Sequence, residues 1–132
     1  MARILLIEPD RVLADIYRLA FEAAGHKVLM CASAQSAIFA ADTARPDLVV
    51  LELQLIEHSG IEFLYEFRSY PEWQTIPAVI LSNVPPHEFR GSHDLLTKEL
   101  GVAAYYYKPQ TSLATLLVSV TELCGGHSVK AA

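Results

Sequence analysis

The sequence predicts an α/β fold in which a parallel sheet lies between two layers of helices. Short apolar runs, each typical of a strand buried on both faces, alternate with segments whose apolar residues recur at helical spacing. Four of these runs end in a charged or hydroxyl residue: Glu8, Glu52, Ser82 and Lys108. Because open α/β sheets place their sites at the carboxyl ends of parallel strands, we expect these side chains to converge.

Two helices are expected to alternate with the first three strands along the chain. Residues 12–24 carry apolar side chains at helical spacing, and Gly25 follows as a common helix stop. An alanine-rich segment follows the second strand, and Ser33 is placed to cap it. The expected elements are a strand over 3–7, a helix over 12–24, a strand over 26–31, a helix over 34–43 and a strand over 48–51.

The second half of the chain continues the alternation. A third helix is expected from Gly60 to Tyr70, because Pro71 stops it. Residues 83–91 are dense in proline and glycine, which delays the fourth helix. In this third helix, Ile61, Leu64 and Tyr65 are expected to face the sheet. The remaining expected elements are a strand over 78–81, a helix from Ser92 to Gly101, a strand over 104–107, and a helix over 112–124 that Gly125 and Gly126 end.

Five strands alternating with five helices form a three-layer sandwich, and right-handed crossovers leave few topologies. We expect the flavodoxin-like strand order 2-1-3-4-5, which places the ends of the first and third strands side by side at the switch point. Residues 1–124 are expected to form one domain. A short flexible C-terminal tail is expected over residues 125–132.

Composition restricts the classes of function. With 52% apolar and 19% charged residues the chain lies well above the regime of disorder, and no apolar run approaches the ~20 residues that span a bilayer. Lys and Arg number 10 against 15 Asp and Glu, without a basic cluster, which argues against direct nucleic-acid binding. The N-terminus shows no leader, and Cys31 and Cys124 show no pairing pattern. We expect a cytoplasmic protein without membrane association.

The residues at the four strand ends occur along the chain in the order acid, acid, hydroxyl and lysine, and this order matches a known protein family. Further matching features are Pro46-Asp47 before the third strand, Gly60 at the start of the following helix, Lys108-Pro109, and an aromatic residue, Tyr105, three positions before the lysine. Together they resemble the response-regulator receiver domain of two-component signalling. The resemblance covers roughly residues 2–124.

This resemblance implies roles for the converging residues. Glu52 aligns with the aspartate that accepts a phosphoryl group from a histidine kinase, and Pro9 aligns with what is usually the second acid of a Mg²⁺-binding pair. Glu8 and Asp10 form an acidic pocket that holds Mg²⁺ weakly if at all, and no other cofactor is expected. The implied switch residues are Ser82, Tyr105 and Lys108.

Glutamate is longer than aspartate by one methylene, so the Glu52 carboxylate reaches toward where phosphoryl oxygens would lie. If it contacts Lys108 and Ser82, it mimics the activated arrangement, with Tyr105 turned inward. The mimic is partial, because a phosphoryl group brings about −1.5 to −2 charge and three acceptor oxygens. The alternative is a Glu52–Lys108 ion pair that serves no signal. For Asp10, an N-cap of the first helix is the simpler role.

The sequence therefore indicates an atypical receiver that is not an enzyme and that acts through phosphorylation-independent protein–protein interaction. The resemblance places its contacts on the face of the fourth helix, fifth strand and last helix. The expected partner there is a signalling protein, a kinase or output partner, or a second copy in a homodimer. Two alternatives stay open: a phospho-accepting receiver that uses Mg²⁺, and a small-molecule sensor with the loop around Pro85-Pro86 as a lid.

Overall fold

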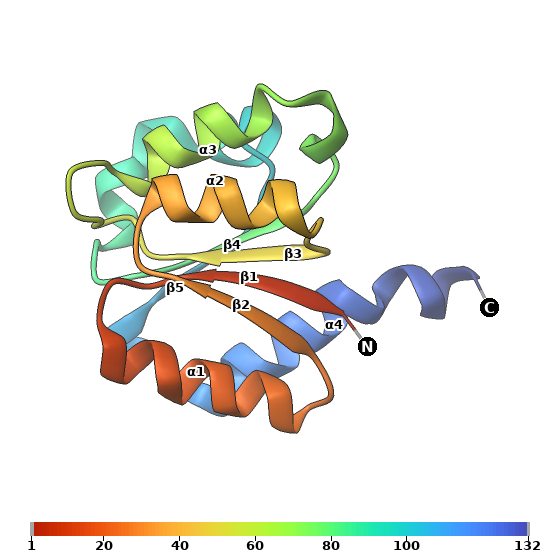
Figure 1. Ribbon diagram of the computed structural model, residues 1–132. Helices are drawn as coiled ribbons and strands as arrows, with labels where there is room; N and C mark the ends of the chain where they lie inside the picture. The colour runs from red at the N-terminus through yellow and green to blue at the C-terminus, as the bar shows by residue number, and fades with distance from the viewer. Residues whose placement is uncertain (1, 132) are drawn as a thin grey trace.

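A five-stranded sheet lies between two layers of helices in the computed structural model, which describes residues 2–131, with side chains through residue 124 (Figure 1). All neighbouring strands are parallel, in the order β2-β1-β3-β4-β5, which confirms the predicted topology. The strands are β1 (Arg3–Ile7), β2 (Lys27–Cys31), β3 (Leu48–Leu51), β4 (Ala78–Ser82) and β5 (Val102–Tyr107).

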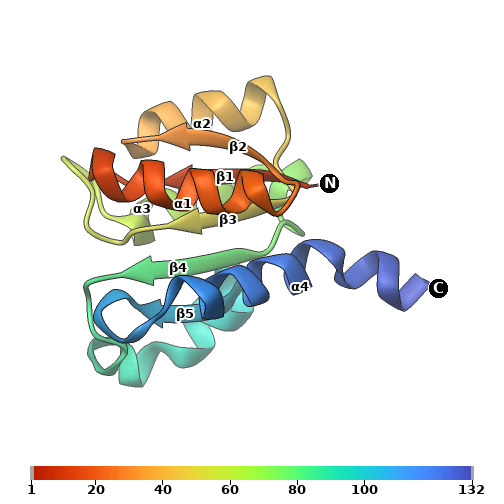
Figure 2. The ribbon, with the colours of Figure 1, turned by 90° about the horizontal axis from the view of Figure 1, so that it is seen from below.

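Helices cover both faces of the sheet. One face packs against α1 (Arg11–Ala23) and α4 (Leu113–Ala131), which lie in front of the sheet in Figure 2. The other face packs against α2 (Ala34–Thr43) and α3 (Gly60–Arg68), which lie above the sheet in Figure 1. This covering on both sides explains why the central strand β3 is apolar and buried at every position.

Successive side chains along β1 and β3 enter different hydrophobic cores, because side chains of a strand alternate between the two faces. Leu5 and Val49 belong to the core under α2 and α3. Leu6 and Val50 belong to the core under α1 and α4. All four are buried, so the two cores fix the register of the central strands.

Local signals set the helix ends. The Asp10 carboxylate accepts hydrogen bonds from the N–H groups of Val12 and Leu13 at 3.0 and 3.1 Å, so it caps α1. Ser33 caps α2, as the sequence predicts. Gly25 follows α1 with a φ of 95°, a left-handed conformation that favours glycine, in agreement with the predicted stop.

The segment expected to form a fourth α-helix is irregular. A 3₁₀ segment, η2, spans Pro86–Ser92, and a single π-helical turn, η3, spans Leu95–Glu99. The Leu100 N–H donates to the carbonyl of Leu95 at 3.0 Å, which is the five-residue spacing of a π-turn. The helix expected from Ser92 to Gly101 is therefore present at this place, but it ends in a π-turn, which is wider than a turn of α-helix, instead of continuing as a regular α-helix.

The inward face of α3 also differs from expectation. Phe63, Leu64 and Phe67 are buried, whereas Tyr65 is 52% exposed and Ile61 is only partly buried. The rings of Phe63 and Phe67 stack with centroids 5.3 Å apart. Aromatic side chains bury more apolar area than Ile, so the helix rotation that buries both rings is favoured and leaves the Tyr65 hydroxyl in solvent.

The last helix continues past its predicted end. Helix α4 runs through Gly125 and Gly126 to Ala131. Glycine lowers helix stability by about 1 kcal/mol but keeps its N–H donor, so a glycine pair permits a stop without imposing one. The domain boundary at residue 124 and the flexible tail stay predictions, and Ala132 lies outside the described residues. Within residues 2–131, no helix has both the length and the apolar character needed to cross a membrane.

Candidate functional site

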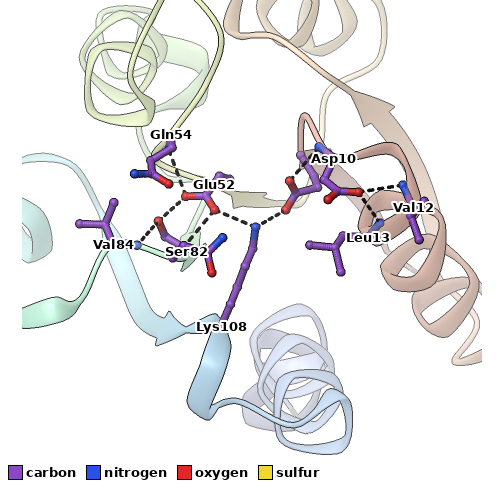
Figure 3. A network of polar contacts seen from close by, with 10 residues as sticks. Asp10, Val12, Leu13, Glu52, Gln54, Ser82, Val84 and Lys108 are labelled. Carbon is purple, nitrogen blue, oxygen red and sulfur yellow. Dashed lines mark hydrogen bonds and ion pairs between the residues drawn. The ribbon is translucent and has the colours of Figure 1, made fainter.

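The carboxyl ends of β1, β3, β4 and β5 bring four polar side chains into one cluster (Figure 3). Lys108 Nζ lies 2.6 Å from Glu8 Oε1 and 2.7 Å from Glu52 Oε1. The Ser82 hydroxyl donates a hydrogen bond to Glu52 Oε2. Glu8, Glu52 and Ser82 are all buried, so the charges that the sequence places at strand ends meet away from bulk water.

The Glu52 carboxylate accepts hydrogen bonds from four donors. Oε1 accepts from Lys108 Nζ at 2.7 Å and from the Asn83 N–H at 3.2 Å. Oε2 accepts from the Ser82 hydroxyl and from the Gln54 N–H at 3.0 Å. Since a carboxylate offers about four lone-pair sites, this group is fully engaged.

Strand pairing positions the two acids. Ile7 and Leu51 are register partners in β1 and β3, so the residues that follow them, Glu8 and Glu52, leave the sheet side by side. The Glu52 N–H extends the ladder by donating to the Ile7 carbonyl at 3.0 Å. Gly60, at the start of α3, packs closely here, because an added Cβ would lie 2.8 Å from the Glu52 carbonyl oxygen.

The acidic pocket of Glu8 and Asp10 is occupied by the protein's own donors. Glu8 Oε2 accepts from the Asp10 N–H at 3.0 Å, while its other oxygen pairs with Lys108. Asp10 uses its carboxylate to cap α1, and Pro9 has no side-chain oxygen. No group of three or more His, Cys, Asp or Glu among the described residues is arranged to hold a metal. Mg²⁺ favours near-octahedral oxygen ligation, and both carboxylates already accept hydrogen bonds from groups of the protein itself.

A chain of hydrogen bonds connects Glu52 to the loop after β4 and to Tyr105. The Ser82 hydroxyl that donates to Glu52 also accepts from the Val84 N–H at 3.0 Å. The Tyr105 hydroxyl donates to the Val84 carbonyl at 2.6 Å, and its ring lies 6.0 Å from that of Phe89. Burial, together with the charge of Glu52, raises the pKa of Tyr105 to about 12, so it remains a donor at neutral pH.

Electrostatics stabilise the charged forms of the central pair. Burial favours a higher pKa for Glu52, but hydrogen bonds from Lys108, Ser82 and the Gln54 N–H outweigh it and hold the pKa below its ordinary value. Burial favours a lower pKa for Lys108, but its bonds to Glu52 and Glu8 raise the pKa above its ordinary value. The carboxylate and the ammonium are therefore both charged at neutral pH.

Two contributors to this site are not identifiable from the sequence. Gln54 and Asn83 act through main-chain N–H groups, which every non-proline residue carries. Their residue types therefore give no signal. The carbonyl of Val84, which accepts from Tyr105, is hidden for the same reason.

Residues 4–111 match the family described as "Response regulator receiver domain". The chain is similar to the KDP operon transcriptional regulatory protein KdpE of Escherichia coli (strain K12), with 29% identity over 108 residues, 77% of this chain and 47% of that protein. It is also similar to the probable transcriptional regulatory protein TcrX of Mycobacterium tuberculosis, with 30% identity over 105 residues, 75% of this chain and 44% of that protein. The chain thus spans less than half the length of these relatives.

Solved structures share the fold. A response regulator receiver domain protein from Methanospirillum hungatei JF-1 superposes with a TM-score of 0.83 at 18% identity, covering 98% of each chain. The chemotaxis response regulator CheY4 of Vibrio cholerae superposes with a TM-score of 0.81 at 21% identity, covering 93% of this chain and 98% of that one. The sequence match over residues 4–111 and the shared fold agree, and the chain belongs to the response-regulator receiver family.

Proposed function

We propose that this chain is an atypical receiver, a two-component-type signalling module in which Glu52 replaces the phosphorylatable aspartate and acts without phosphoryl transfer. The observation that carries the proposal is the full engagement of the Glu52 carboxylate by Lys108, Ser82 and two backbone N–H groups. The longer glutamate side chain supports this role, because it lets a carboxylate reach the lysine and the hydroxyl directly.

The mechanism is a permanent hydrogen-bonded connection from the acid to the loop after β4. Glu52 holds the Ser82 hydroxyl, Ser82 holds the Val84 N–H, and the Val84 carbonyl holds the Tyr105 hydroxyl. A fixed negative charge thereby keeps loop and tyrosine in one arrangement. The effect is partial compared with a phosphoryl group, which carries more charge and one more acceptor oxygen.

A phospho-accepting receiver is a less favourable alternative. Nucleophilic attack requires a carboxylate oxygen with a free lone pair, whereas both Glu52 oxygens are engaged. Lys108 and backbone N–H groups occupy the acids that a metal would need. Displacement of a reacting atom by about 1 Å can cost on the order of 100-fold in rate, and glutamate displaces the acceptor by one bond length.

We propose that output passes through the face formed by η3, β5 and α4. A groove of about 410 Å³ lies there, lined by Tyr106, Ala114, Thr115, Val118, Ser119 and Glu122. Val118 of α4 is 58% exposed, and Leu95 of η3 is partly exposed. This surface supports contact with a signalling protein, a kinase or output partner, or a second copy in a homodimer.

Two further parts of the proposal concern the class of partner and the cellular compartment. The net charge of −5 favours partners other than nucleic acid. Cys31 and Cys124 are both free, which suits the reducing cytoplasm.

Intact mass spectrometry tests the proposed loss of phosphoryl transfer. Wild type and Glu52→Asp are incubated with acetyl phosphate and Mg²⁺. We expect wild type to remain unmodified, because its acceptor is displaced and engaged. Modification of Glu52→Asp by one phosphoryl group would show that the shorter acid alone restores the acceptor position, which favours mimicry by Glu52.

A substantial phosphorylated fraction of wild type that Glu52→Gln abolishes would overturn the proposal. If neither protein is modified, the proposal of a phosphorylation-independent interaction module is retained. In that case Pro9 and the loop after β4, together with Glu52, prevent phosphorylation of the site. Mimicry then loses its support.

A further inference from the structure

Outside the Glu52 cluster, a groove of about 590 Å³ runs between α2 and α3, which lie side by side over one face of the sheet (Figure 1). Its floor is made by Ala34, Phe63 and Trp73, which are buried in the core. Its walls carry exposed side chains from both helices. The remaining lining residues are Gln35, Ile38, Phe39, Asp42, His58, Glu62, Glu66 and Tyr70.

Aromatic surface continues from the floor of this groove to its rim. Phe39 is 75% exposed, although α2 packs on the sheet through alanines and does not need it. Tyr70 is 36% exposed, and its ring centroid lies 4.6 Å from that of Trp73. An apolar side chain inserted here would contact rings on several sides and remove Phe39 from water, which favours an apolar occupant.

The rim carries negative charge on both sides. Asp42 lies on α2, while Glu62 and Glu66 lie one turn apart on α3, and the lining contains neither Lys nor Arg. Across residues 2–124 none of these three acids forms an ion pair. Because like charges gathered around an apolar groove repel each other, a cationic occupant gains electrostatic energy.

The walls also define how an occupant binds. Both are α-helices, whose backbone groups along the groove are used within the helices, so no strand can add by main-chain pairing. Recognition must use side chains, as when an amphipathic helix lies in a groove. We propose that the groove binds a basic amphipathic helix of a partner protein. One large apolar side chain of the partner helix would lie between Phe39 and Tyr70, and Lys or Arg side chains of the partner helix would face the three acids. This surface is distinct from the η3–β5–α4 face.

A second copy of the chain is a poorer occupant. Helix α1 exposes Ile16 and Leu19, but its Arg18 is already paired with Asp15 and Glu22 at 3.3 and 3.0 Å. The charge of Arg18 is thus neutralised within the helix. Two copies of net charge −5 also repel each other, and a head-to-tail contact between different faces closes only when the rotation between copies completes a ring.

Tryptophan fluorescence provides the test, because Trp73 is the single tryptophan of the sequence and lies in the groove. The probe is a synthetic helical peptide of about four turns built from Lys, Leu and Ala with one central Phe. The control peptide replaces each Lys by Glu. We expect saturable changes in Trp73 emission with the basic peptide and none with the acidic one.

Paired variants locate the binding. Phe39→Ala and Glu66→Lys alter exposed side chains and should weaken binding about tenfold or more, because the first removes an aromatic contact and the second places a positive charge against the basic peptide. Tyr65→Ala removes an exposed aromatic of α3 that lies outside the groove, and Glu99→Lys makes the same charge change on η3. Both controls should bind within about twofold of wild type.

Three results would overturn the proposal. The first is absence of peptide binding, or equal affinity of wild type and Phe39→Ala. The second is self-association of the chain that Phe39→Ala abolishes, which assigns the groove to a second copy. The third is Phe39-dependent binding of benzyltrimethylammonium without peptide binding, which assigns it to small organic cations.

Discussion

At Lys108 a single ammonium group contacts two buried carboxylates. The side chain of Lys108 is 8% exposed, and those of Glu8 and Glu52 are each 3% exposed. Without the lysine, the two acids would face each other at low dielectric, and each would raise the pKa of the other. The stability of the site therefore depends on this residue more than on either acid.

Lys108→Met should lower the free energy of unfolding by about 3 kcal/mol, because it leaves two buried carboxylates without their counter-ion. Urea unfolding at neutral pH measures the loss. Lys98→Met is the matched control: Lys98 pairs with Asp94 at 3.8 Å, but both side chains are more than three quarters exposed, so a change below about 0.5 kcal/mol is expected. A loss at Lys108 no larger than at Lys98 would contradict the assigned role.

At this scale the sequence identifies side chains better than it identifies main-chain groups. Glu8, Glu52, Ser82 and Lys108 could be predicted to converge because each directly ends or follows an apolar strand. The N–H donors to Glu52 could not, since their positions depend on loop conformation.

At the scale of elements, the close approach of α3 to the end of β3 depends on the absence of a side chain at Gly60. A Cβ there would lie 2.8 Å from both the Glu52 carbonyl oxygen and the Leu53 Cα, and backbone atoms cannot rotate away. The same helix start is held by Ser59, which accepts from the Glu62 N–H at 3.1 Å. The end of β3 and the start of α3 are thus packed directly against each other.

Gly60→Ala should lower the free energy of unfolding by about 2 kcal/mol, because the added methyl group forces α3 away from β3. Thermal and urea unfolding measure it. Gly91→Ala is the control: no atom lies within 4 Å of the added Cβ, so stability should be unchanged or slightly higher. Equal effects at both positions would show that helix propensity, not crowding, decides the outcome.

The pattern of apolar residues predicts that a helix exists better than which face it buries. In α1, Val12, Ile16 and Leu19 fit helical spacing but are 68%, 44% and 58% exposed, whereas Ala14 and Phe21 are buried. Two apolar stripes compete on this helix, and only the position of the sheet decides between them. The π geometry of η3 could not be predicted, because propensity rules describe regular helices.

At the scale of the whole molecule, the ion cluster gives stability a dependence on pH. Glu52 has a pKa below its ordinary 4.5, so its contribution is present above that value and is lost as pH falls through the lowered pKa. Lys108 has a pKa above its ordinary 10.5, so its contribution is present below that value and is lost as pH rises through the raised pKa.

The difference in unfolding free energy between wild type and Glu52→Gln should therefore be largest on a plateau between these limits and should shrink in acid. Urea unfolding of both proteins over a series of buffers measures it. A difference that stays constant from neutral pH to well below 4.5 would show that the Glu52 charge does not contribute to stability.

The overall topology could be predicted because right-handed crossovers and strand order leave few choices once five alternating units are recognised. The faces that remain uncovered could not. Exposure of Phe39 or Val118 depends on how helices rotate against the sheet, which is a property of the assembled molecule.

The bonds to Glu52 join parts of the chain that lie far apart in sequence: 30 positions separate it from Ser82 and 56 from Lys108. Closing such long loops is entropically expensive, which favours late formation of the cluster, after the strands have paired. Contacts that are absent from the transition state mainly slow unfolding and leave the folding rate nearly unchanged. The charges at the sheet edge would thus slow unfolding and lengthen the lifetime of the native state in the presence of proteases.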